Sequence, residues 1–122
     1  MIGYTTLGTN DIGRAARFYD ALLSEFSAKR AMEMETFIAW AAAPGGPMLA
    51  VIKPYDQKPA TVGNGVMVAL AASSKAQVDA IHRKALELGG KDEGAPGLRG
   101  GNFYAAYFRD LDGNKLNAFF MG

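Results

Sequence analysis

The strongest indication of the fold is a run near the C-terminus, Phe108-Arg109-Asp110-Leu111-Asp112-Gly113-Asn114-Lys115-Leu116-Asn117. Its middle, from Asp110 to Asn114, has the Asp, Gly and Asn residues that tight turns require. The β-prone runs on either side, Phe103–Arg109 and Lys115–Met121, predict two strands joined by this turn. The two aspartates also suggest calcium, but the loop is shorter than the roughly twelve residues of an EF-hand and lacks its closing Glu. The run is therefore interpreted as a hairpin turn.

The chain has two halves that predict the same order of elements, a strand, a helix and three further strands. In the first half these are Ile2–Leu7, a helix with its apolar face from Ile12 to Phe26, Ala31–Met34, Phe37–Ala42 and Met48–Ile52. In the second half they are Val66–Ala71, a helix with its apolar face from Val78 to Leu88, Lys91–Glu93, Phe103–Arg109 and Lys115–Met121. Serines before the second helix and Gly89-Gly90 after it are typical of helix caps.

This pattern predicts one domain, residues 1–122, with an α+β fold of two βαβββ modules. Module one covers residues 1–53, a polar linker rich in turn formers covers 54–64, and module two covers 65–122. Each helix can cover only one face of its sheet. We therefore expect a curved mixed sheet whose other face borders a cleft, a common location for ligands.

The composition excludes several classes of function. The net charge is +1 and the basic residues are dispersed, which argues against nucleic acid and against an anionic membrane surface as partners. Cysteine is absent, so no thiolate metal site is possible. No apolar run approaches the roughly 20 residues of a membrane span, and the N-terminus lacks a signal-peptide pattern. These features predict a cytoplasmic protein.

Motifs near the two ends of the chain resemble the vicinal oxygen chelate superfamily, which includes glyoxalase I, extradiol dioxygenases, and fosfomycin- and bleomycin-resistance proteins. The first motif is Thr9-Asn10-Asp11 followed by Arg17-Phe18-Tyr19, and the second is Arg109-Asp110-Leu111-Asp112-Gly113-Asn114. The resemblance covers essentially the whole chain. It implies a glyoxalase-like fold and a homodimer.

The resemblance also implies where a metal ion would be held. Metal-dependent members take one ligand from the first strand and one from the last strand of each half. The matching positions here are Tyr4, Ala50, Met67 and Asn117. Divalent cations in such sites need imidazole or carboxylate ligands, whereas alanine offers no donor and a thioether suits softer metals. The sequence therefore predicts no metal at this position and no other cofactor.

Strand alternation predicts instead an apolar pocket with a few polar points, which is the usual lining of a small-molecule site. The side chains expected in it are those of Tyr4, Met48, Ala50, Met67, Asn117 and Phe119. The glycine-rich segment 94–101 is interpreted as a mobile loop at the rim, from which Arg99 could reach an anion. The alternative is that the sheets close on these side chains and leave no cavity.

The function predicted from these residues is metal-independent binding of a small organic molecule, with an aromatic or carboxylate-bearing metabolite favoured. The first alternative is a glyoxalase-like lyase, or a related enzyme acting on a small oxygenated substrate. It would use either a metal at non-standard positions or metal-free acid–base catalysis by Tyr4, Glu33 or Glu35. A second alternative is a vestigial cleft in a domain that serves assembly. No catalytic residue is assigned, and His82, the only histidine, is predicted to be a partly exposed structural residue.

Overall fold

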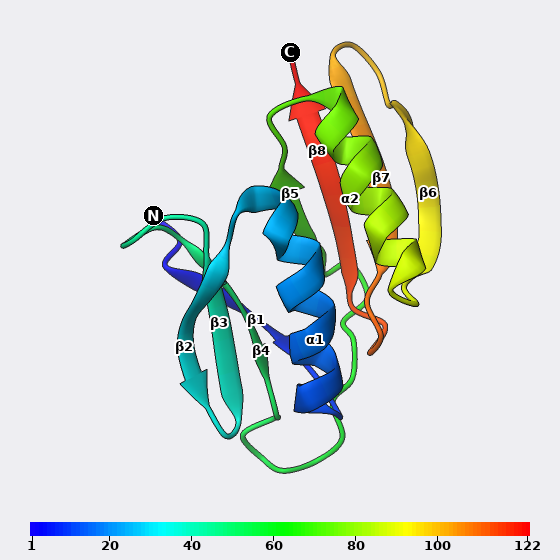
Figure 1. Ribbon diagram of the computed structural model, residues 1–122. Helices are drawn as coiled ribbons and strands as arrows, with labels where there is room; N and C mark the ends of the chain where they lie inside the picture. The colour runs from blue at the N-terminus through cyan, green and yellow to red at the C-terminus, as the bar shows by residue number, and fades with distance from the viewer. The chain divides into compact units, whose positions relative to one another are not determined.

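The computed structural model describes residues 1–122, which form two compact units, Met1–Val62 and Gly63–Gly122 (Figure 1). Each unit contains one α-helix and one four-stranded sheet. The division between the units lies inside the stretch 54–64, whose composition predicts a linker. No helix is long and apolar enough to cross a membrane.

The first unit follows the predicted order of elements. It consists of β1 (Tyr4–Gly8), α1 (Ile12–Leu23), a 3-10 turn η1 (Ser24–Phe26), β2 (Lys29–Met34), β3 (Phe37–Ala41) and β4 (Met48–Ile52). The strand order is β1-β4-β3-β2, with β1 parallel to β4 and the other neighbours antiparallel. The helix connects β1 to the next strand and packs against one face of this sheet (Figure 1).

Helix α1 begins where Asp11 accepts a hydrogen bond from the Arg14 backbone N–H at 3.0 Å. Its apolar face is buried against the sheet, with the Tyr19 and Trp40 ring centroids 5.8 Å apart. Because successive side chains along a strand point to opposite faces, the sheet has a second face that no helix of this unit covers. We call this the helix-free face of unit 1.

The second unit repeats the arrangement. It consists of β5 (Val68–Ala71), α2 (Lys75–Glu87), β6 (Lys91–Leu98), β7 (Phe103–Arg109) and β8 (Lys115–Met121). The strand order is β5-β8-β7-β6, with β5 parallel to β8. Helix α2 starts at Ser74, which accepts a hydrogen bond from the Gln77 backbone N–H, and it packs on β6, β7 and β8. The α+β prediction of two βαβββ modules is confirmed, and the uncovered side of this sheet is the helix-free face of unit 2.

The turn between β7 and β8 is the predicted hairpin turn. The buried Asp110 carboxylate accepts the backbone N–H groups of Asp112 and Asn114, each at 2.9 Å, and the Asn114 amide at 3.0 Å. Gly113 has φ +88°, a conformation that favours glycine. The carboxylate therefore satisfies the turn's own donors.

Two expectations are wrong. Strand β6 extends to Leu98 instead of ending near Glu93, so most of the expected rim loop is strand paired with β7. Register shifts between Asp92 and Gly97 place bulges in this edge strand, which lets it include glycines and a proline. His82 is 6% exposed rather than partly exposed, and its Nε2 lies 3.0 Å from the Asp92 carboxylate.

Candidate functional site

The helix-free face of unit 1 carries three of the predicted ligand-binding residues. In the sheet register, Tyr4 is opposite Met48, and Ala50 is opposite Thr6 and Ala39. These residues share the face that α1 does not cover. Tyr4 is 58% exposed. A hollow of about 850 Å³ opens beside Tyr4 and Met48, bordered mainly by the N-terminal residues and the segment 41–47.

The helix-free face of unit 2 carries Asn117 and Phe119, two residues apart on β8 as predicted. Asn117 is 1% exposed, and its Oδ1 has no hydrogen-bond partner. Nearly all buried polar groups in folded proteins are paired, so this orphan acceptor needs an explanation. Its register neighbours on β5 and β7 are Ala69 and Tyr107.

Aromatic rings share the sheet face of this amide, and two cations lie against one of these rings. The Phe119 ring stacks on Phe103 with centroids 5.6 Å apart. The Tyr107 ring has the Arg99 guanidinium carbon and the Lys115 ammonium each 5.5 Å from its centroid. Tyr107, Lys115 and Phe103 are not among the predicted site residues, although alternation along β7 and β8 places them on the same face as Asn117.

Met67 fits the predicted face less well. Strand β5 begins one residue later, at Val68, and Met67 is 39% exposed outside the sheet register. Asn117, Phe119 and Arg99 gather around Tyr107 in unit 2, whereas Tyr4, Met48 and Ala50 gather in unit 1. A single cleft shared by all seven predicted residues stays a prediction.

The residues at the family's metal positions do not fit a divalent ion. Tyr4 offers a phenol and Ala50 offers no donor at all. Met67 offers a thioether and Asn117 an amide. No group of three or more His, Asp or Glu side chains is placed to hold a metal ion. Zinc and the other divalent ions of such sites take imidazole or carboxylate ligands, so the donor set argues against one here.

Protein purified without chelator is therefore expected to contain far less than one equivalent of zinc, nickel or iron by elemental analysis. The cause is the absence of imidazole and carboxylate donors at these positions. Near-stoichiometric metal that disappears in Asn117→Leu would contradict this prediction. A metal content that is the same in that variant as in the wild-type protein would show that the ion is bound elsewhere.

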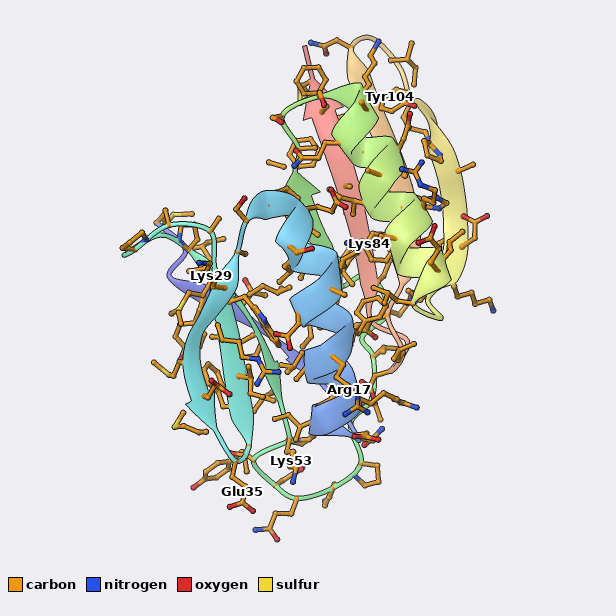
Figure 2. All side chains as sticks on the ribbon, viewed as in Figure 1. Arg17, Lys29, Glu35, Lys53, Lys84 and Tyr104 are labelled. Atoms are coloured by element: carbon orange, nitrogen blue, oxygen red, sulfur yellow. The ribbon has the colours of Figure 1, made fainter.

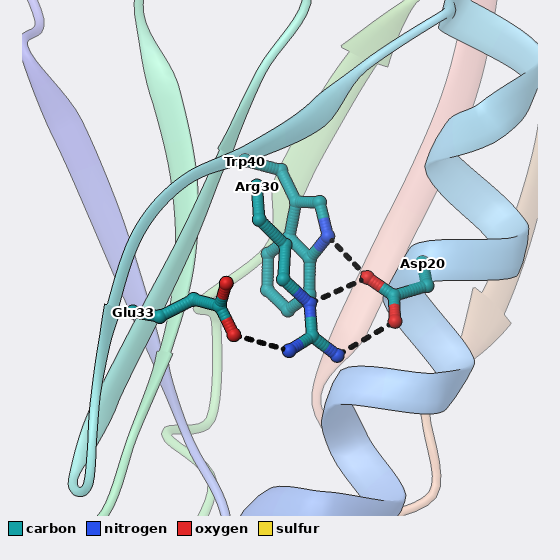
Figure 3. A network of polar contacts seen from close by, with 4 residues as sticks. All are labelled: Asp20, Arg30, Glu33 and Trp40. Atoms are coloured by element: carbon teal, nitrogen blue, oxygen red, sulfur yellow. Dashed lines mark hydrogen bonds and ion pairs between the residues drawn. The ribbon is translucent and has the colours of Figure 1, made fainter.

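Glu33 faces away from the helix-free face of unit 1 (Figure 3). It accepts a 2.7 Å hydrogen bond from Arg30, whose guanidinium also forms two bonds to Asp20 on α1. The Trp40 indole N–H donates to the same Asp20 carboxylate at 2.9 Å. The Arg30 guanidinium lowers the pKa of the Asp20 carboxyl below its usual range. Glu33 thus belongs to an ion-pair network on the α1 side.

Glu35 lies in the turn between β2 and β3, beyond the ends of both strands (Figure 2). Neither it nor Glu33 is positioned on the sheet face that carries Tyr4. The arrangement of these two carboxylates therefore gives no support to a general base on that face.

Comparison with known proteins agrees with the motifs. The model of the Glyoxalase/Bleomycin resistance protein/Dioxygenase superfamily matches residues 1–118. A glyoxalase/bleomycin resistance protein from Albidiferax ferrireducens T118 is 33% identical over 100% of this chain and 99% of that chain, with a TM-score of 0.92. A lactoylglutathione lyase from Agrobacterium tumefaciens, 21% identical over 98% of this chain and 92% of that one, shares the fold with a TM-score of 0.72. A comparison with curated proteins finds no match. This chain belongs to the Glyoxalase/Bleomycin resistance protein/Dioxygenase superfamily.

Proposed function

We propose that the protein binds a small organic molecule on the helix-free faces of its sheets, without a metal ion. The observation that carries this proposal is the buried, unpartnered carbonyl of Asn117. Leaving such a group unpaired costs about 1–3 kcal/mol, a cost that a ligand N–H or O–H can remove on binding. The retained orphan acceptor is thus better explained by a ligand than by packing.

The surroundings of Asn117 support an aromatic or otherwise flat ligand. Phe103 and Phe119 form a stacked pair on the same face, and Tyr107 adds a third ring. Apolar walls with a few placed polar groups are typical of small-molecule sites. A glyoxalase-like lyase would need a metal ligand set or a placed acid–base pair, and no observation on these faces favours either.

Asn117→Leu tests the proposal, because it should change stability and binding in opposite directions. Leucine has a similar size and removes the orphan carbonyl, so we expect the free energy of unfolding to rise by about 1 kcal/mol. The same variant should lose the thermal stabilisation that library metabolites give the wild-type protein, since ligands raise the melting temperature by mass action.

Asn114→Leu is the matched control. This asparagine is also buried, but its amide donates to Asp110. Its replacement should destabilise the protein. If Asn117→Leu destabilises to the same extent, the Asn117 carbonyl is satisfied in solution and the proposal loses its basis.

We also infer that the protein is a homodimer. Tyr4 and Met34 on the helix-free face of unit 1 are 58% and 54% exposed, which leaves apolar surface in water. Sedimentation velocity at micromolar concentration should give a species of twice the chain mass. A single monomeric species under these conditions would contradict the inference.

A further inference from the structure

We propose that the ligand of unit 2 carries a carboxylate, which Arg99 and Lys115 bind beside the Tyr107 ring. This inference rests on the proposed function and specifies the chemical class of its ligand. Both cations lie 5.5 Å from the centroid of the same ring. Neither forms an ion pair with a carboxylate of the protein.

The strand backbone fixes the position of Arg99. Its Nη1 donates to the Gly97 carbonyl at 2.9 Å, and its Nη2 donates to the Ala95 carbonyl at 2.6 Å. A guanidinium has five N–H donors, so three remain for a ligand. Holding the side chain in advance reduces the entropy that binding would otherwise cost.

The glycines of β6 make room for this guanidinium. A Cβ on Gly94 would lie 3.2 Å from Arg99 Nη2, and a Cβ on Gly97 would lie 3.1 Å from Nη1. Glycine weakens a strand interior, and such a glycine often marks a close approach of another group. Gly94 and Gly97 of β6 therefore lie directly beneath the arginine that crosses the strand.

A third cation on this face, Arg109, is already neutralised. Its Nε donates to Glu93 at 2.5 Å, and this contact is the main reason that the pKa of Glu93 lies below its usual value. Lys115 adds a weaker attraction to the same carboxylate. The positive charge that remains for a ligand is therefore that of Arg99 and Lys115.

The order of side chains along the face defines the rest of the ligand. Tyr107 and Asn117 are direct register partners, which places their Cβ atoms about 4.5–5.5 Å apart. A carboxylate bound against the Tyr107 ring would thus lie on the strand position next to Asn117, whose carbonyl could accept a hydroxyl or N–H group of the same small molecule. Phe119 is the next residue on this face of β8, and its stacking on Phe103 of β7 suits a flat apolar body. The class of ligand is a hydroxy- or amino-substituted aromatic carboxylate.

Titrations of the full chain with the three hydroxybenzoate isomers and their amides, followed by NMR chemical shifts, test this inference. We expect at least one carboxylate to bind at least about tenfold more tightly than its amide, as charge-assisted hydrogen bonds are the stronger ones. Arg99→Gln should remove most of this preference, and Arg99→Lys should restore part of it. Arg83→Gln, on an exposed position of α2, should leave it unchanged.

The outcomes separate the two proposals. If amides and carboxylates bind equally and shift Asn117, the carboxylate inference is overturned and the proposed binding function stands. If no probe shifts Asn117 or Tyr107, the proposed function is overturned as well. If Arg99→Gln does not fold, Lys115→Gln provides the same comparison.

Discussion

Asp110→Ala is expected to lower the free energy of unfolding by about 3 kcal/mol, because it removes the acceptor of the β7–β8 turn. The buried carboxylate accepts two backbone N–H groups and one side-chain amide. Alanine leaves these donors without their partner in a site from which water is largely excluded. Urea denaturation, followed by circular dichroism, measures the loss as a shift of the midpoint.

Two further variants test whether this loss of stability comes from the buried hydrogen bonds of Asp110. Asp110→Asn keeps one acceptor oxygen but turns an amide toward the Asn114 amide, so an intermediate loss is expected. Asp56→Ala removes a similar bond, which the Lys58 backbone N–H donates to the Asp56 carboxylate in an exposed loop. Its effect should stay within about 0.5 kcal/mol. Equal losses in Asp110→Ala and Asp56→Ala would show that burial of the turn does not matter.

Gly90→Ala is expected to destabilise the protein by about 2–3 kcal/mol through overpacking. A Cβ at this position would lie 2.7 Å from the Arg109 carbonyl oxygen and 2.8 Å from the Ala85 carbonyl oxygen. Both atoms are backbone, so no side chain can move aside to relieve the contact. The Gly90 N–H also donates to the Ala85 carbonyl at 2.8 Å, which fixes the approach of the chain to the helix end. The same urea denaturation measures the loss.

Gly3→Ala is the control for Gly90→Ala, since a Cβ at Gly3 would meet nothing within 4 Å beyond its chain neighbours, and its φ is not positive. It should be neutral or slightly stabilising, because alanine restricts the unfolded chain. Gly89→Ala should fall between the two, as Gly89 has φ +98° and is strained by any side chain. A neutral Gly90→Ala would contradict the close packing of α2 on β7.

Elements with local signals are predictable from the linear chain. The strands Met48–Ile52, Phe103–Arg109 and Lys115–Met121 have the same bounds in the structure as in the sequence-based prediction. Alternation, helical spacing and turn residues act over a few positions, and they are visible without a partner strand. The same local parity places Asn117 and Phe119 on one face.

Features that depend on distant partners become visible only in the folded chain. Strand β6 contains glycines and a proline that favour a loop, and pairing with β7 makes it a strand. His82 is buried because Asp92, on a different element, offers it a hydrogen bond. Glu33 turns toward α1 because Arg30 joins it to Asp20.

The polar contacts of the candidate site also depend on residues that are distant in the sequence. The resemblance to the superfamily assigns Asn117 to a ligand position, and only the packed sheet shows that its carbonyl is buried without a donor. Likewise, Arg99 and Lys115 meet the same ring, that of Tyr107, only in the folded chain. Desolvation and the pairing of charges depend on which residues meet in space, and a linear pattern does not contain that information.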